Sequence, residues 1–405
     1  MNYDEALAWL YGLQRFGIKL GLENIRRLID ELEVAPETTV IHVAGTNGKG
    51  SVCAIIDAIA RAAGIRSGLY TSPHLVTFRE RIRVNGEMIS REEVAHGLTT
   101  IRNLIATWNP QPTFFEIATA LALAHFKNKG CEVIVLETGL GGRLDATNAV
   151  DSQIAVITPI DFDHQQFLGD TIEQIAAEKA GIIKRGQLAL SAQQPDSVAD
   201  VLRARAAEVA VDVQFVPFDL PVGLHVNLRG AHQRANAALA IAAAKTVLPI
   251  TANAIGLGLA DVEWPGRFQI WSDKIVIDGA HNPAGARARA GTWQQEFGDD
   301  RAKVILAVLD DKAADEIVNI LAPIAREFVL PKIRGARAIE PEALRELVAS
   351  VAPNIPATTS PNVSEALAHA QRQDGRALVT GSLHFVGEVL AHLGGEPDAL
   401  EECMQ

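Results

Sequence analysis

Residues 39–51 read Thr-Val-Ile-His-Val-Ala-Gly-Thr-Asn-Gly-Lys-Gly-Ser, and this stretch decides the class of fold. Its first five residues form an apolar, β-branched run, as in a strand that is covered on both faces of a sheet. The segment 45–51 follows and leads into an Ala- and Ile-rich stretch of helical length. Strand, glycine-rich loop and helix in this order favour phosphate binding, because backbone N–H groups, the helix dipole and a lysine ammonium converge there.

The loop departs from the general phosphate-binding pattern in two places. Val43 stands six positions before Lys49, where the pattern has Gly, and Gly50 separates Lys49 from Ser51. The alternative interpretation is a strand-to-helix turn with a surface lysine. The order of the elements favours phosphate binding, and on physical grounds alone it predicts only that a nucleoside triphosphate binds.

The alternation of short apolar runs and longer helical patterns continues beyond this loop. Strand-like runs occur at 133–136 and 154–157, and Ala- and Leu-rich helical patterns occur at 55–63 and 117–126. Runs of this kind predict an α/β fold with a doubly wound, mostly parallel sheet.

A second α/β series begins after Trp264-Pro265-Gly266, where Pro and Gly punctuate the chain. Its strand-like runs lie at 274–277, 304–308, 328–330 and 377–380. Because a chain of 405 residues is too long for one ordinary core, we expect two domains. We expect a P-loop domain over residues 1–264 and a smaller, Rossmann-like α/β domain over residues 265–405.

Composition excludes several classes of protein. A net charge of -12 argues against a nucleic-acid partner, because such binding depends on clustered Lys and Arg. The three cysteines are far apart, in no spacing typical of a zinc site or a redox dithiol. No run approaches the ~20 apolar residues that span a membrane, and the first residues do not resemble a secretory signal. We expect a cytoplasmic monomer with no membrane partner.

Polar residues follow several strand-like runs, at the sheet edge where α/β proteins bind ligands. Ser72 and Glu137 offer oxygen atoms that suit Mg²⁺, and His164 is an unusual ligand for a second ion. The alternative for each is that it caps the following helix. Lys179, on a helix that starts near Thr171, would by composition alone be a solvated helical lysine.

Taken together, these segments resemble the folylpolyglutamate synthase/dihydrofolate synthase family of the Mur ligase superfamily. The resemblance extends from the first helix to Gly381-Ser382-Leu383, and the series of motifs is far more specific than any single one. The matching segments are Gly45–Ser51, Thr71–Leu75, Thr113–Glu116, Glu137–Asn148, Asp163-His164, Glu178–Ile182 and Asp278–Pro283.

The resemblance implies an ATP site and a metal site. The ATP-binding residues it implies are Asn47, Gly48, Lys49, Gly50, Ser51, Asn236, Arg267 and Asp278. It implies that Ser72, Glu137 and His164 hold magnesium, with two ions present. It also implies that Lys179 is carbamylated, which would turn a cation into an anionic oxygen ligand for the second ion.

The resemblance also implies the substrates. The segments that match the family's pterin-binding residues are Thr113, Phe114, Phe115 and Glu116, together with Leu144, Asp145 and Ala146. The implied reaction joins L-glutamate to dihydropteroate or a reduced folate through an acyl phosphate, with Lys49, Lys179 and His281 as catalytic residues. His384 stands where the family often has an aromatic residue, a departure that we expect to affect packing rather than chemistry.

Three other functions stay open at this point. One is a Mur-type amino-acid ligase that acts on a non-folate carboxylate, which the P-loop and metal residues do not exclude. Another is a non-catalytic module in which ATP acts as a switch. The third is a P-loop kinase, whose product would be a stable phosphorylated molecule. Whether the acceptor is dihydropteroate, a reduced folate or both also stays open, and we lean to both.

Overall fold

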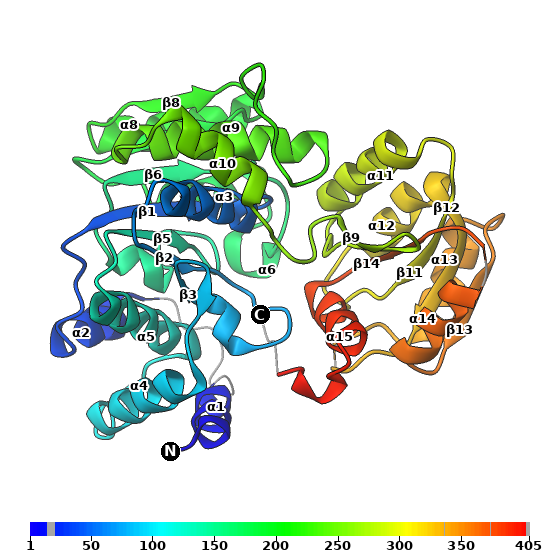
Figure 1. Ribbon diagram of the computed structural model, residues 1–405, viewed down its shortest axis with the longest axis horizontal. Helices are drawn as coiled ribbons and strands as arrows, with labels where there is room; N and C mark the ends of the chain where they lie inside the picture. Colours follow the sequence, from blue (N-terminus) through cyan, green and yellow to red (C-terminus); the bar gives the residue numbers. More distant parts are fainter. Residues whose placement is uncertain (14–20, 336, 373, 402–405) are drawn as a thin grey trace. The chain divides into compact units, whose positions relative to one another are not determined.

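The computed structural model describes residues 1–13, 21–335, 337–372 and 374–401, and the chain divides into two compact units. Unit 1 comprises Met1–Ser72, Arg79–Asn227 and Arg234–Val262. The main part of unit 2 begins at Glu263. Unit 2 also includes two short segments from earlier in the chain, Pro73–Phe78 and Leu228–Gln233. Figure 1 shows unit 1 in blue to green and the main part of unit 2 in yellow to red.

The described part of unit 1 has an eight-stranded sheet in the order β4-β3-β2-β5-β1-β6-β7-β8. Neighbouring strands are parallel except at one edge, where β3 pairs antiparallel with both β2 and β4. The chain moves from β1 to one side of the sheet and later to the other, so the carboxyl end of β1 lies at a switch point of the kind where open α/β sheets bind ligands. The strands are β1 (Thr39–Ala44), β2 (Ser67–Tyr70), β3 (Ile82–Val84), β4 (Glu87–Met88), β5 (Val133–Glu137), β6 (Ile154–Ile157), β7 (Leu188–Ala192) and β8 (Val213–Val216).

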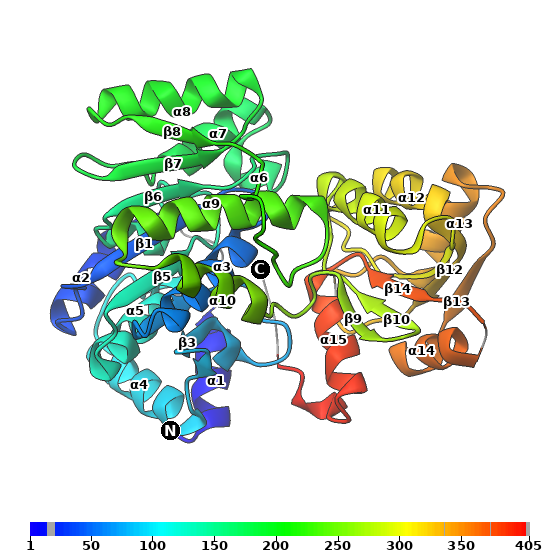
Figure 2. The same ribbon diagram turned by 45° about the horizontal axis from the view of Figure 1, so that its top comes forward.

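Helices cover the sheet of unit 1. Helix α10 packs so closely on α3 that a Cβ atom at Gly258 would lie 2.6 Å from the Cα atom of Ile59. Figure 2 shows α10 with α3 and α9. The helices are α1 (Tyr3–Gly12), α2 (Glu23–Glu31), α3 (Lys49–Ala62), α4 (Arg91–Leu104), α5 (Phe114–Lys129), α6 (Gln165–Leu168), α7 (Ile172–Ala180), α8 (Asp196–Glu208), α9 (Ala231–Val247) and α10 (Ala252–Asp261).

In its described residues, unit 2 has a six-stranded sheet in the order β13-β12-β11-β14-β10-β9, parallel except for β9. Its strands are β9 (Gln269–Ser272), β10 (Ile275–Ile277), β11 (Ala302–Leu306), β12 (Ala325–Pro331), β13 (Ala357–Ser360) and β14 (Ala377–Thr380). Its helices are α11 (Pro283–Phe297), α12 (Ala314–Leu321), α13 (Pro341–Val351), α14 (Val363–Arg372) and α15 (Leu383–Leu393).

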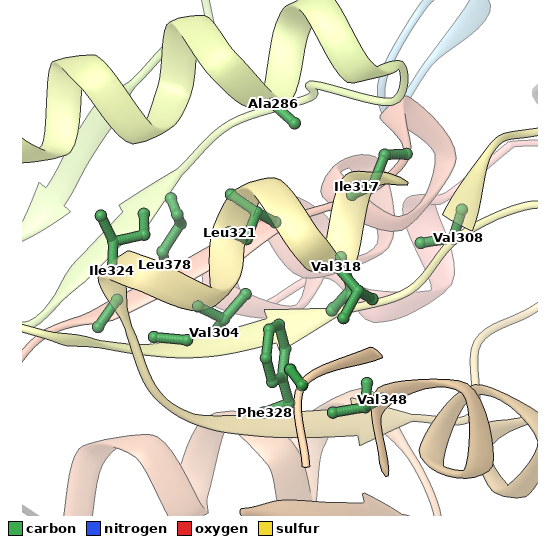
Figure 3. Close-up of a cluster of buried hydrophobic side chains, with 14 of the residues drawn as sticks. Ala286, Val304, Val308, Ile317, Val318, Leu321, Ile324, Phe328, Val348 and Leu378 are labelled. Carbon is green, nitrogen blue, oxygen red and sulfur yellow. The ribbon is translucent and has the colours of Figure 1, made fainter. Parts of the chain in front are cut away.

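Alternate residues of the unit 2 strands enter different cores, as the period of a strand requires. Val304 packs with α11, α12 and α13, whereas the next residue, Ile305, packs with α14 and α15. Figure 3 shows the first of these cores, where Leu321 and Val318 of α12 lie over the strands. Both faces of the sheet are therefore buried, which explains the continuous apolar runs in its strands.

The predicted fold class is confirmed, and the predicted strands all occur with small shifts at their ends. The start of β12 shifts by three residues, from 328 to Ala325. The strand β11, expected at 304–308, shifts by two residues at both ends and spans Ala302–Leu306. The cause is Lys303, a charged residue that is fully buried within the strand and donates a hydrogen bond to the carbonyl of Ala370 (2.9 Å). Within the described residues, no helix is both long enough and apolar enough to cross a membrane.

Candidate active site

The glycine-rich loop between β1 and α3 has a backbone that only glycine adopts easily. Gly45 and Gly48 have φ angles of 147° and 89°. A Cβ atom at Gly45 would lie 1.9 Å from Oγ1 of Thr158, and one at Gly48 would lie 2.6 Å from Oδ1 of Asn236. Helix α3 begins at Lys49 with no hydrogen bond from a side-chain cap. Uncapped N–H groups at a helix start, with the positive end of the dipole, suit an anion such as phosphate.

A second strand end holds this loop in place. The backbone N–H groups of Thr46 and Asn47 both donate to the carbonyl of Pro159, at 3.0 and 3.1 Å. Oγ1 of Thr46 donates to the carbonyl of Asp161 (2.9 Å) and accepts from its N–H (3.1 Å). The segment after β6 therefore fixes the shape of the loop after β1 before any ligand binds.

Two lysines converge on the loop. Nζ of Lys49 donates to the carbonyls of Gly45 (3.1 Å) and Thr46 (3.3 Å). Nζ of Lys179, from the last turn of α7, donates to the same Gly45 carbonyl at 3.0 Å. Composition alone makes Lys179 a solvated helical lysine, and the structure corrects this, because its side chain is buried with 4% of the residue exposed.

Burial changes the proton affinity of Lys179. Loss of water and the nearby charge of Lys49 lower its pKa to about 7, against the opposing effect of Asp163 and Asp145. A lysine with this pKa is partly neutral near neutral pH. A neutral amine is the form that can react with an electrophile, so the environment gives Lys179 a chemistry that a surface lysine lacks.

The predicted metal ligands are brought together in part. Oε2 of the buried Glu137 accepts a hydrogen bond from the backbone N–H of Ser72 (3.0 Å), so these two residues are adjacent. His164 precedes α6 with a positive φ of 51°, and its N–H donates to Oδ1 of Asp163 (3.0 Å). Among the residues described, no three or more His, Cys, Asp or Glu side chains group as they would around a metal ion.

The two predicted pterin segments are linked through Gly139, which Phe115 contacts and whose N–H donates to Asp145. Phe115 packs on Gly139, where a Cβ atom would come within 2.5 Å of the ring, and its ring centroid is 5.9 Å from that of Tyr70. Thr113 and Glu116 form a capping box that starts α5, with each side chain accepting from the other's N–H. These two residues thus place the Phe115 ring, a structural role that the sequence reasoning missed.

Asp145 organises the loop after β5. Its Oδ2 accepts from the N–H groups of Gly139 (2.9 Å) and Leu140 (2.8 Å), and its Oδ1 accepts from the N–H and hydroxyl of Thr147. The hydroxyl oxygen of Thr147 lies 2.8 Å from Nε2 of buried His42, and burial lowers the pKa of His42 to about 3. Of the neighbouring predicted residues, Leu144 is partly exposed and Ala146 is buried.

The remaining predicted residues belong to unit 2. Asp278 directly follows β10 and is fully buried, whereas Arg267 and His281 are partly exposed. Nδ1 of His281 lies 2.9 Å from the carbonyl of Gly279, so this nitrogen carries the proton in the neutral ring and Nε2 is left as an acceptor. Asn282 caps α11 by accepting from the N–H of Gly285 (2.8 Å), as the His-Asn-Pro sequence indicates.

Two buried arginines, one in each unit, lie beside predicted site residues, and the sequence reasoning did not single out the second, Arg289. Arg81 lies over the ring of Phe114, 5.3 Å from its centroid. Arg289 forms an ion pair with Asp278 at 2.6 Å. A signal for Arg289 does exist, because it stands three residues after Ala286 and four before Trp293, which puts it on the buried face of α11.

Comparisons with known proteins identify the family of the chain. The model of the Mur ligase middle domain matches residues 43–213, and that of the Mur ligase glutamate ligase domain matches residues 266–383. The dihydrofolate synthase/folylpolyglutamate synthase of Bacillus subtilis is 35% identical and covers 96% of this chain and 99% of its own length.

Solved structures of similar proteins bind nucleotides. A Mycobacterium tuberculosis folylpolyglutamate synthase complexed with ADP and AMPPCP has a TM-score of 0.87 at 32% identity, over 97% of this chain and 99% of that one. A bifunctional folylpolyglutamate synthase/dihydrofolate synthase with Mn, AMPPNP and L-glutamate bound has a TM-score of 0.85 at 33% identity, over 96% and 98%. This chain belongs to the dihydrofolate synthase/folylpolyglutamate synthase family of Mur ligases.

Proposed function

We propose that this protein is an ATP-dependent ligase that joins L-glutamate to folate-type acceptors, both dihydropteroate and tetrahydrofolate. The observation that carries the proposal is the pair of lysines, Lys49 and Lys179, that converge on the Gly45 carbonyl at an uncapped helix start. We infer the substrates from the family, because its members are named for the folates that they produce. Residues 1–264 would bind ATP and the pterin, and residues 265–405 would bind glutamate.

The loop after β1 would hold the phosphates of ATP. Its residues are Asn47, Gly48, Lys49, Gly50 and Ser51, with Asn236 against Gly48. In the structure Lys49 donates to backbone carbonyls, so nucleotide binding would exchange these neutral partners for phosphate oxygens. A charged acceptor makes a stronger hydrogen bond, and this exchange therefore favours the bound state. We also propose an ATP contact for Arg267, whereas Asp278, which is fully buried, would support the ATP site through the backbone turns that it holds.

Magnesium fits the oxygen donors of unit 1. Ser72 and Glu137 would hold one ion, and His164 would support a second. One or two protein oxygens would suffice, because Mg²⁺ usually keeps several waters and binds substrate phosphates. When bound, Mg²⁺ would neutralise charge on the β- and γ-phosphates.

Lys179 would act as a carbamate and support the second ion. Its pKa of about 7 leaves a fraction of neutral amine, the form that adds to carbon dioxide. The product carries an anionic oxygen in place of a cation, which removes the like charge beside Lys49. Burial at 4% exposure would protect this group from water.

The pterin would bind near Phe115 and the loop after β5, which contains Gly139 and Asp145. Its contacts would come from Thr113, Phe114, Phe115 and Glu116, and from Leu144, Asp145 and Ala146. Asp145 already accepts four hydrogen bonds from the loop, so it would also fix the loop's shape. An aromatic ring that stacks on a flat heterocycle contributes roughly 0.5–1.5 kcal/mol beyond burial.

The chemistry has two steps. An oxygen of the acceptor carboxylate attacks the γ-phosphorus of ATP, and ADP leaves. The amine of glutamate then attacks the acyl carbon, phosphate leaves, and the amine loses a proton. Lys49 would offset phosphate charge in the first step, while His281 would lie near the phosphates with Nε2 as an acceptor.

Oxygen tracing tests this sequence of steps. An acceptor labelled with ¹⁸O in its carboxylate should give phosphate that carries one labelled oxygen, and a glutamyl adduct by mass spectrometry. A stable phosphorylated acceptor would instead support a kinase. ATP binding with no product from any acceptor would support a switch module. A glutamyl adduct only with a non-folate carboxylate would assign another Mur-type ligase.

A further inference from the structure

Asp278 of unit 2 is a buried carboxylate that is saturated by protein donors. It is 0% exposed. Its Oδ2 accepts from the N–H of Phe268 (2.7 Å), and its Oδ1 accepts from the N–H of Ala280 (2.8 Å). Nε of Arg289 lies 2.6 Å from the same Oδ1. A carboxylate so enclosed acts on its surroundings chiefly through the groups that it holds.

The first group that Asp278 holds is a strained turn. Phe268 has a φ of 48°, a left-handed conformation that side-chain-bearing residues rarely adopt. Its ring is anchored at 6.4 Å from that of Trp293 and 6.2 Å from that of Phe297. The hydrogen bond to Asp278 therefore stabilises a conformation that would otherwise relax, and Arg267 is the residue directly before it.

The second group is the turn after β10. The N–H of Gly279 donates to the carbonyl of Gly266 (2.8 Å), which ties this turn to the first. Ala280, held by Asp278, directly precedes His281. One carboxylate thus fixes the backbone beside Arg267 and beside His281, the two residues of unit 2 to which we assign roles near ATP.

Arg289 is costly to bury in this position. It is 4% exposed, and its guanidinium carbon lies 5.9 Å from the centroid of the Phe268 ring. Its Nε forms an ion pair with Asp278, but neither Nε nor Nη1 has a hydrogen-bond partner. Burial and the charges of Arg289 and Arg267 lower the pKa of His232 to about 3, so His232 stays neutral and adds no third cation. An ion pair of this kind is weak support for folding alone, because its desolvation offsets much of the attraction.

We infer that Arg289 is a positioning residue for the ligase reaction: it holds Asp278 so that the two turns present Arg267 and His281 to the nucleotide. The inference rests on the proposed function for the roles of those two residues. Because Arg289 is buried, it would not act by direct contact with substrate or ATP. Its action passes through Asp278 and two backbone hydrogen bonds.

The test compares Arg289→Met and Arg289→Lys with the wild-type enzyme. Loss of the pairing should raise KM for ATP about tenfold, the effect of one charged hydrogen-bonded contact, and leave KM for the folate acceptor within about twofold. The amides of Phe268 and Ala280 should exchange faster with deuterium. Arg289→Lys, which keeps the charge, should recover part of both effects.

Two controls separate positioning from stability. Arg287→Met makes the same substitution at an exposed position of α11, and Lys303→Met removes a buried cation elsewhere in unit 2. Neither should change KM for ATP. An Arg289→Met enzyme that loses only kcat, in proportion to its folded fraction, would overturn the inference, as would unchanged exchange at Phe268 and Ala280. If Arg289→Met does not fold, Arg289→Lys decides by the same measurements.

Failure of the proposed function would be seen separately. A wild-type enzyme that incorporates no glutamate would remove the ligase assignment. ATP binding by calorimetry and amide exchange in the same variants would still test whether Arg289 holds the two turns. Unchanged ATP affinity in Arg289→Lys and Arg289→Met would then contradict the inference by itself.

Discussion

Two loops follow central strands of the two sheets and lead into helices, yet they are built in opposite ways. After β1, the loop that ends at Gly48 starts α3 without a side-chain cap. After β10, the loop from Asp278 to Asn282 starts α11 with Asn282 as the cap and a buried carboxylate beneath the turn. The first helix start is left to an external anion, and the second is completed by the protein's own side chains.

This difference indicates which loop contributes mainly to ligand binding and which contributes mainly to folding stability. In unit 1 two lysines surround one carbonyl, Gly45, an arrangement that gains when an anion arrives. In unit 2 the acid is already paired with an arginine, and the helix start is already capped by Asn282. Substitutions in the first loop should therefore change ATP binding and catalysis, whereas loss of the cap in the second should mainly change stability.

The largest expected effect is on catalysis in Lys49→Met. Removal of a cation that offsets phosphate charge should lower kcat by roughly 10²–10³-fold, while the fold is retained because Lys179 still donates to Gly45. Glutamate incorporation at saturating ATP measures this. Lys245→Met, at an exposed position of α9, is the matched control. A kcat of Lys49→Met within about threefold of the wild-type value would contradict the proposed difference between the two loops.

Gly48→Ala and Gly64→Ala form a matched pair that sharpens the comparison. Both glycines have positive φ angles, 89° and 76°, so each substitution should destabilise the protein by about 1 kcal/mol. A Cβ atom at Gly48 would also meet Oδ1 of Asn236 at 2.6 Å, whereas nothing lies within 4 Å of one at Gly64. Calorimetry should show ATP affinity about tenfold weaker in Gly48→Ala alone. Equal weakening in both would assign the effect to backbone strain.

The pH dependence of stability tests the buried amine beside the first loop. The folded-state pKa of Lys179, about 7, lies below its ordinary value of 10.5. Below the lower value the lysine is charged in both states and its burial opposes folding fully. As the pH rises from about 7 to 10.5, the unfolded chain keeps the proton of Lys179 and the folded chain loses it, so folding stability rises.

Lys179→Met removes this effect, and its advantage in stability over wild type should therefore shrink by about 2 kcal/mol between about pH 7 and about pH 9. Urea unfolding in bicarbonate-free buffer measures the difference. A constant difference across this range would show that Lys179 titrates as a solvated lysine.

The smallest effect is expected at the capped helix. Asn282→Ala should lower the free energy of unfolding by about 1 kcal/mol, because α11 loses its cap. Thr251→Ala, which removes the cap of α10, is the control and should lose a similar amount. KM for ATP should stay within about twofold of wild type in both. A larger rise in Asn282→Ala would mean that the second loop also binds through its helix start.

Much of this arrangement can be predicted from the sequence because local chemistry dictates it. The run before Gly45 must be a buried strand, and the glycines after it allow positive φ angles, so the first loop follows from a single segment. The alternation of strands and helices predicts both sheets. The strand at Lys303 shifts because a buried lysine interrupts the apolar pattern that marks its position.

What the sequence does not reveal depends on residues far apart in the chain. Lys179 has a helical context typical of a solvated lysine, and only its approach to Gly45 buries it. The role of Arg289 depends on its ion pair with Asp278, which stands eleven positions earlier in the chain. Thr113 and Glu116 cap the start of α5. Such roles are set by packing between elements, which no short motif encodes.

Incorporation of labelled glutamate tests the central claim most directly. The wild-type enzyme, with ATP and Mg²⁺, is offered dihydropteroate and tetrahydrofolate separately, and Lys49→Met is measured beside it. The account predicts ATP-dependent incorporation with both acceptors and its near loss in the variant. No incorporation with either acceptor, in protein that still binds ATP, would contradict the assignment of a folate ligase.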